Sequence, residues 1–135
     1  MTWKREENTY YVYRDNVLIS NEANLCLSGN DLLIYEKPTQ QTILCEDWAN
    51  CGDGKIREAE VLFSPTASFW RREGDSFYFY HEGQLVEREL ESKRKKDDLE
   101  VYDKEYDKTY IFSGFANIED NKLRAAVLKT GVDFR

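Results

Sequence analysis

Hydrophobic and polar residues alternate in short runs along almost the whole chain, and clusters of Gly, Asn and Asp separate these runs. Ser76–Glu82 is the densest run, with Gly74-Asp75 before it and Gly83 after it. Alternation with a period of two residues is typical of a strand with one buried face. Gly-Asp and Asn-Gly pairs between two such strands are typical of tight hairpin turns. The pattern therefore predicts antiparallel strands joined by hairpins.

Twelve segments carry this strand pattern. They are residues 9–14, 17–20, 23–28, 32–36, 42–46, 56–63, 68–72, 76–82, 84–91, 99–103, 108–115 and 122–129. The last segment also fits a helix, because Leu123, Ala126 and Val127 recur at helical spacing. Asp120 would cap that helix and Gly131 would end it. We favour the strand.

A meander of up to twelve short strands has to protect its outer edges, and the compact solutions are a barrel or a two-layer sandwich. We therefore expect an all-β fold, an antiparallel meander that closes into a small barrel, with a sandwich as second choice and at most one short C-terminal helix. Pro38 and Pro65 lie between apolar runs, and we expect neither a linker nor an internal repeat. One barrel-like domain over residues 1–135 is the prediction.

Composition and charge narrow the classes of protein. Of the 135 residues, 41% are hydrophobic and 14% aromatic, which is typical of a folded domain with a single core. A net charge of -7 repels nucleic-acid phosphates and attracts basic surfaces, so we expect no nucleic-acid partner. The chain starts without the apolar stretch of a secretory signal, and no run approaches the length of a membrane span. We expect a soluble, cytoplasmic protein without a membrane partner.

Metal and cofactor chemistry has little support in the residues. Cys26, Cys45 and Cys51 form no Cys-x-x-Cys pair, so we expect free thiols. The segment 47–60 resembles a calcium-binding EF-hand loop when it is aligned on Gly54. The first and third ligand positions would then be Ala49 and Cys51, which carry no side-chain oxygen. We therefore interpret the segment as a turn, assign no metal, and leave the cofactor unknown.

Several bulky residues on the predicted strands, and one on a predicted loop, are candidates for ligand contact. They are Phe77, Phe79, His81, Tyr110, Phe112 and Trp48. On the inward faces of a barrel, together with Leu25 and Leu27, they would line a cavity for a small apolar or aromatic ligand. The same residues would also fill a barrel that has no cavity.

Catalytic candidates are weak. His81 is the only histidine and has no nucleophile beside it in the sequence. Gly74-Asp75-Ser76 resembles the start of the GDS-type esterase signature, which implies a nucleophilic serine. The Asp-x-x-His of those enzymes is missing, because Tyr78 precedes His81 by three residues. A hairpin turn explains the same residues, and we assign no catalytic residue.

Charge runs have simple structural interpretations. Lys93–Lys96 is the only basic run, and acidic residues flank it on both sides, so we expect a solvated loop or strand end. Glu87, Glu89 and Glu91 share a face at a spacing of two residues, as a glycosidase carboxylate pair would. Among 26 acidic residues such sets also arise by chance, and we interpret them as a solvated sheet face.

Three classes of function remain. The first is a non-enzymatic binding protein for a small apolar or aromatic ligand. The second is a small acidic inhibitor or adaptor that docks on a basic partner surface. Its expected exposed anchors are Tyr10, Tyr11, Tyr13, Trp48 and Trp70. The third is a hydrolase-type enzyme centred on His81, Cys51 or a carboxylate pair. We rank them in this order.

Overall fold

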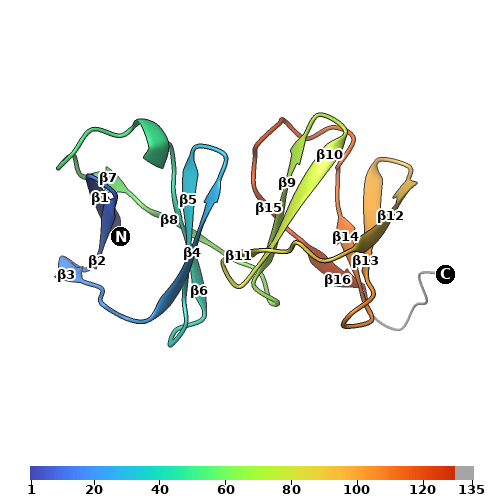
Figure 1. Ribbon diagram of the computed structural model, residues 1–135, viewed down its shortest axis with the longest axis horizontal. Coiled ribbons are helices and arrows are strands. Elements are labelled where there is room, and N and C mark those ends of the chain that lie inside the picture. Colours follow the sequence, from blue (N-terminus) through green and yellow to red (C-terminus); the bar gives the residue numbers. More distant parts are fainter. Residues whose placement is uncertain (130–135) are drawn as a thin grey trace. The chain divides into compact units, whose positions relative to one another are not determined.

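The described part of the chain folds into antiparallel β-strands joined by turns and loops, with one short 3-10 helix (Figure 1). The structure is a computed structural model, and it describes residues 1–129 of the 135. Glu6 pairs with Thr9, and Glu73 pairs with Ser76, so residues 7–8 and 74–75 form the tight turns between paired strands. The prediction of an all-β antiparallel fold is confirmed.

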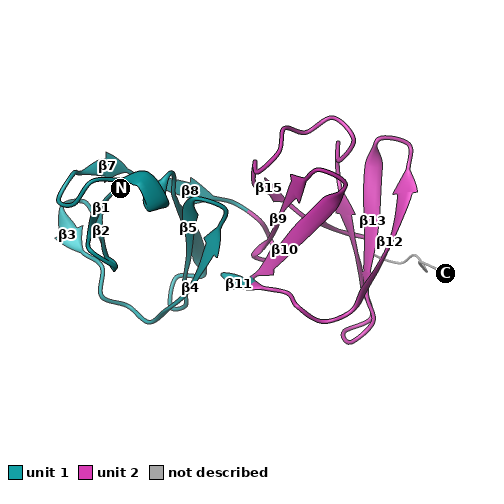
Figure 2. Cartoon of the chain, turned by 45° about the horizontal axis from the view of Figure 1, so that its top comes forward, with its two compact units in different colours: residues 1–63, 82–84 teal, residues 64–81, 85–135 magenta. Residues whose placement is uncertain are grey.

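The chain divides into two compact units (Figure 2). Unit 1 comprises Met1–Phe63 and Glu82–Gln84, and unit 2 comprises Ser64–His81 and Leu85–Arg135. Each unit has a hydrophobic core of its own, around Trp3 in unit 1 and around Trp70 in unit 2. That all residues 1–135 fold as one cooperative domain stays a prediction.

Unit 1 contains two four-stranded sheets. Its elements are β1 (Thr2–Glu6), β2 (Thr9–Arg14), β3 (Val17–Leu18), β4 (Ala23–Ser28), β5 (Asp31–Glu36), β6 (Gln41–Cys45), the 3-10 helix η1 (Trp48–Asn50), β7 (Arg57–Glu58) and β8 (Glu60–Leu62). The strand orders are β3-β2-β1-β7 and β4-β5-β6-β8.

Unit 2 also contains two four-stranded sheets, in the orders β11-β10-β9-β15 and β12-β13-β14-β16. The strands of these sheets are β9 (Ser68–Glu73), β10 (Ser76–His81), β11 (Gln84–Leu85), β12 (Leu90–Lys95), β13 (Asp98–Asp103), β14 (Lys108–Phe112), β15 (Arg124–Ala125) and β16 (Val127–Lys129), and of these residues Gln84 alone belongs to unit 1. One residue, Ala126, separates β15 from β16, so a single stretch of chain runs from one sheet into the other. Ala59 has the same place between β7 and β8.

Neither unit closes into a barrel through the strand pairings of residues 1–129. In unit 1 the outer strands of the two sheets are β3 and β4, and in unit 2 they are β11 and β12. The pairings leave each unit open at one side, between these outer strands. The barrel and the sandwich both stay predictions.

The two units repeat the same fold, and the expectation that the chain has no internal repeat is wrong. Strand order is identical when β1 is matched with β9 and each later strand with its successor. Each residue n of the range 1–62 then corresponds to residue n + 67, as in Trp3 and Trp70. Identical residues at corresponding places include the pairs Trp3/Trp70, Arg5/Arg72, Tyr13/Tyr80, Asp31/Asp98, Tyr35/Tyr102, Thr42/Thr109, Asn50/Asn117 and Arg57/Arg124.

Backbone conformation repeats with the sequence. Residues with left-handed φ correspond in pairs, which are Glu7/Gly74, Asp15/Glu82, Asn16/Gly83, Gly29/Lys96, Gln40/Asp107, Asp47/Gly114 and Gly54/Asn121. Such φ values favour Gly, Asn and Asp. The turns therefore have the same backbone conformation in both units, although only some of these positions hold a glycine.

Each unit also buries one carboxylate at the end of its central strand. Glu36 is 1% exposed and accepts hydrogen bonds from Arg14, Asn21 and Thr39. The corresponding Asp103 is 1% exposed. Burial alone would raise the pKa of both carboxyl groups, but the hydrogen bonds and the neighbouring arginine charge outweigh it and lower both pKa values.

Several observed strands differ from the predicted segments, and the predicted segment 56–63 contains two strands, β7 and β8. β1 was not predicted, because Trp3 is its only apolar residue. The predicted strand 84–91 is two strands, β11 and β12, and the basic run lies mostly inside β12, where lysines on an outer strand discourage pairing with other chains. The C-terminal strand is confirmed as β15 and β16 and the helix is wrong, while Gly131 lies outside the described residues.

Candidate ligand-binding site

Unit 2 contains an open cavity of about 530 Å³. It is lined by Asp75, Ser76, Phe77, Ser92, Lys93, Arg94, Leu99 and Phe115. These residues come from β10 and the turn before it, from β12 and β13, and from the turn after β14. The cavity thus lies at the open side of unit 2, and we call it the seam pocket.

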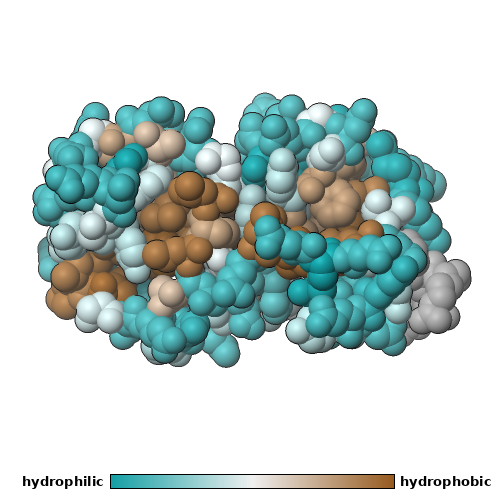
Figure 3. All heavy atoms as spheres, viewed as in Figure 1, coloured by the Kyte–Doolittle hydropathy of each residue, from teal (hydrophilic) through white to brown (hydrophobic). Residues whose placement is uncertain are grey.

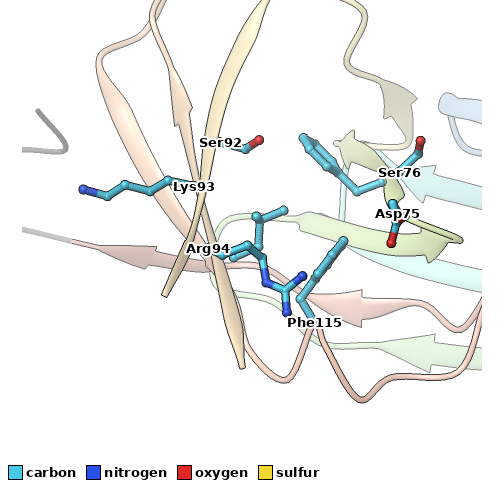
Figure 4. Close-up of a pocket in the computed structure, with 8 residues that line it drawn as sticks. Asp75, Ser76, Ser92, Lys93, Arg94 and Phe115 are labelled. Carbon is cyan, nitrogen blue, oxygen red and sulfur yellow. The ribbon is translucent and has the colours of Figure 1, made fainter. Parts of the chain in front are cut away.

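The strand geometry explains why the pocket lies there. β11 has only two residues, so it leaves the start of β10 without a neighbour on that side. On β12, Arg94 pairs with Leu99 and Ser92 pairs with Val101, so both side chains share the sheet face that carries the core. Successive side chains alternate between faces, and Figure 4 shows Lys93 pointing away from Arg94 and Phe115.

The aromatic side chains that line the pocket pack against the hydrophobic core of unit 2. Phe77 makes an edge-to-face contact with the core residue Phe112, with ring centroids 5.3 Å apart. Phe115 is 3% exposed and tilts against Trp70 at 5.7 Å. Tilted and edge-to-face arrangements are the favoured geometries of aromatic pairs. The walls are therefore part of the packed core of unit 2.

Arg72 fixes the turn that carries Phe115. Its Nη1 donates hydrogen bonds to the carbonyl oxygens of Phe115 and Ala116 at 2.9 and 3.0 Å. The guanidinium also lies 5.4 Å from the centroid of the Phe115 ring. In unit 1, Arg5 makes the corresponding bonds to Trp48 and Ala49, so this arginine brace belongs to the repeated fold.

Arg94 is the lining cation whose side chain lies on the core face of β12. Its guanidinium lies 5.7 Å from the Phe115 ring centroid, a distance typical of a cation–π contact. Within residues 1–129 it makes no ion pair, and its side chain is exposed. Asp75 is the one carboxylate among the lining residues, and Figure 4 shows it on the opposite side of Phe115 from Arg94. The pocket therefore places the N–H donors of the Arg94 guanidinium beside the aromatic ring of Phe115.

The structure distributes the six predicted ligand residues over different places. Phe77 lines the pocket. Phe79, Tyr110 and Phe112 are 2%, 4% and 0% exposed and pack on one another in the core of unit 2. Trp48 is buried against Trp3 in unit 1. The interior between the sheets is thus filled at these positions by the aromatic side chains themselves.

His81 makes a hydrogen bond of 2.9 Å between its Nδ1 and the hydroxyl of Ser68. A serine and a histidine at this distance have the spacing of a nucleophile and its base. Ser68 is 0% exposed, however, and its hydroxyl is also within hydrogen-bond distance of the Thr66 carbonyl oxygen. A substrate carbonyl cannot reach this hydroxyl, so the pair fits a structural role.

The cysteines and the EF-hand-like segment show no reactive arrangement. All three cysteines are free, and burial raises the pKa of Cys45 to about 12 and that of Cys26 to about 11. Both thiols are then protonated at neutral pH and are poor nucleophiles. Asp53 accepts a hydrogen bond from the Glu7 amide, and within residues 1–129 no three His, Cys, Asp or Glu side chains are grouped to hold a metal ion.

Some apolar residues are buried where we predicted exposure, and others are exposed where we predicted burial. Trp48 and Trp70, expected as exposed anchors, are buried. Leu25 and Leu27, expected inside a barrel, are 44% and 61% exposed, although they pair with Ile34 and Leu32 on the core face. The reason is the open side of unit 1 beside β4. Figure 3 shows hydrophobic atoms at the surface of unit 1 in the region of β4.

Unit 1 has different chemistry at the positions that form the seam pocket in unit 2. Leu27 corresponds to Arg94 and Leu25 to Ser92. Sequence reasoning missed Arg94, Leu99 and Phe115 as lining residues. Matching the two halves at a separation of 67 residues would have placed Arg94 on the core face of a strand, because its counterpart is an apolar residue in an alternating run.

Comparisons with protein-family models, curated proteins and solved structures give no match for this chain. In the part of the chain that the structure describes, no helix has the length and apolar character that a bilayer crossing requires.

Proposed function

We propose that this protein is a non-enzymatic binding protein that holds a small apolar or aromatic ligand in the seam pocket of unit 2. The observation that carries the proposal is the cavity of about 530 Å³ with Phe77, Leu99 and Phe115 as walls. Small-molecule sites are typically concave, of about 300–1,000 Å³, mostly apolar and supplied with a few polar groups. The polar groups here are those of Asp75, Ser76, Ser92, Lys93 and Arg94.

We further propose that the two sheets of each unit curl around their core as an incompletely closed barrel. The stretch from β15 to β16, which runs from one sheet into the other, supports this arrangement. We also propose a cytoplasmic location, because three free cysteines fit a reducing compartment.

The other two classes rank lower. Docking on a basic partner surface is favoured by the net charge of -7, but two of its five expected anchors are buried. A hydrolase centred on His81 would need Ser68 to be accessible, and Ser68 is 0% exposed. Neither class has an observation comparable with the cavity.

Filling the pocket should abolish ligand binding without unfolding the protein. Ser92 is exposed on β12 and faces the cavity, so Ser92→Trp places a large side chain in the space that a ligand would occupy. We expect binding of the aromatic probes 2-naphthoate and 2-naphthamide to weaken at least about tenfold, measured by isothermal titration calorimetry.

Ser113→Trp is the matched control, because Ser113 is exposed and does not line the cavity. It should bind both probes as the unchanged protein does, and far-ultraviolet circular dichroism should be the same for all three proteins. If neither probe binds the unchanged protein, or if Ser92→Trp binds as tightly, the proposed function is wrong.

A further inference from the structure

We propose that the ligand of the seam pocket is an aromatic compound with a single carboxylate, and that Arg94 binds this carboxylate. This inference rests on the proposed function and names the class of ligand. It follows from the cation at the pocket, the aromatic walls, the acidic surroundings and the comparison with unit 1.

The guanidinium of Arg94 is available to a ligand. It makes no ion pair within the described residues, whereas the other arginine beside Phe115, Arg72, is bound to three carbonyl oxygens. An arginine offers parallel N–H donors that match the two oxygens of a carboxylate, and such bonds are stronger than those between neutral groups. The position of Arg94 opposite Leu99 directs these donors to the pocket side of β12.

The walls favour a planar aromatic body for the same ligand. Phe77 and Phe115 both line the cavity, and both are held by contacts with the core aromatic residues behind them. Aromatic rings gain more than their buried area when they meet other rings in offset or edge-to-face geometry. Because Arg94 already lies near the Phe115 ring, a carboxylate bound to it would place an attached ring beside Phe115.

The surrounding charge limits the ligand to one carboxylate. Asp75 lines the same cavity, and the chain has a net charge of -7. Lys93 also lines the cavity, but Figure 4 shows its side chain pointing away from Arg94 and Phe115, so a second negative group near Asp75 would lie in a repulsive field. The cavity therefore matches a monoanion with an apolar ring system.

The repeat supplies the substitution that tests this role. Unit 1 has Leu27 where unit 2 has Arg94, so a leucine fits this position of the fold. Arg94→Leu should weaken binding of 2-naphthoate about tenfold and should leave binding of the uncharged 2-naphthamide within about twofold. Calorimetric titration of the full chain at low salt measures both affinities. Added salt should weaken the binding of 2-naphthoate and leave that of 2-naphthamide unchanged.

Lys108→Leu is the matched control, because it removes the same charge from an exposed strand residue of unit 2 that does not line the cavity. It should change neither affinity by more than about twofold. Equal loss in Lys108→Leu and Arg94→Leu would overturn the role of Arg94, since it would show an effect of net charge alone. Equal affinity of both probes for the unchanged protein would also overturn it and would leave the proposed function intact, whereas binding of neither probe would refute the proposed function itself.

Discussion

Trp70→Ala is expected to lower the free energy of unfolding by about 4 kcal/mol. Trp70 is 0% exposed, stacks on Phe112 with ring centroids 4.8 Å apart, and contacts Phe115 at 5.7 Å. Truncation to alanine would leave a cavity at the centre of the unit 2 core, and a large core cavity combines lost burial with lost contacts. Urea denaturation followed by far-ultraviolet circular dichroism measures the change.

Trp70→Phe is the control for this substitution. It keeps a ring that can stack on Phe112, and it removes an indole N–H that has no hydrogen-bond partner in the described part of the chain. We expect it to cost clearly less than the alanine variant. A loss below about 1 kcal/mol for Trp70→Ala would contradict the core described for unit 2. Two separate unfolding transitions, with only one shifted, would contradict a single cooperative domain.

Arg88→Ala is expected to lower the free energy of unfolding by about 3 kcal/mol at neutral pH. Arg88 binds both oxygens of Asp103, through Nε at 3.0 Å and through Nη2 at 2.6 Å. Asp103 is 1% exposed, so removal of the guanidinium would leave a buried carboxylate without its counter-charge. That situation is more costly than the loss of a surface ion pair. Chemical denaturation at pH 7 measures the difference.

Lys104→Ala is the matched control, because Lys104 pairs with Glu91 at 2.8 Å on the surface of the same unit. Its cost should stay below about 1 kcal/mol. Similar losses for the two variants would contradict a special role of the buried pair.

The effect of Arg88→Ala should depend on pH. The pKa of Asp103 is lowered in the folded state, so its ionised form contributes stability above the unfolded pKa. This contribution is lost as pH falls through the folded pKa, because the carboxylate takes up a proton. The difference between Arg88→Ala and the unchanged protein should therefore shrink below about pH 4. A difference that stays constant down to pH 2 would contradict the assignment.

The strands and turns were predictable because the signals for them are local. The segments 9–14 and 23–28 have the observed bounds, and the Gly-Asp turn gave the observed start of the strand at Ser76. The repeat was missed because core partners differ in size between the units, as with Cys45 and Phe112. The available signal was a repeated Trp-x-Arg spacing, which is Trp3 and Arg5 in unit 1 and Trp70 and Arg72 in unit 2.

The site was predicted only in part, because its walls come from distant segments. Phe77 was found from the alternation of its strand. Leu99 reaches the pocket through the pairing of β13 with β14, and Phe115 through the turn that Arg72 holds, and the sequence displays neither contact. Arg94 was hidden in a run of four basic residues, where balanced local charge gave no reason to separate it from Lys93. Only the strand register distinguishes the residue that faces the pocket from the one that points away.

Chemical-shift mapping with 2-naphthoate tests most directly whether the open side of unit 2 is a ligand site. In a ¹H–¹⁵N correlation spectrum of the full chain, we expect shifts at the pocket residues Ser76, Ser92, Arg94 and Phe115. The corresponding residues of unit 1, Thr9, Leu25, Leu27 and Trp48, should stay unchanged and serve as an internal control. Shifts of equal size in both sets, or no shifts at saturating probe, would contradict a ligand site in unit 2.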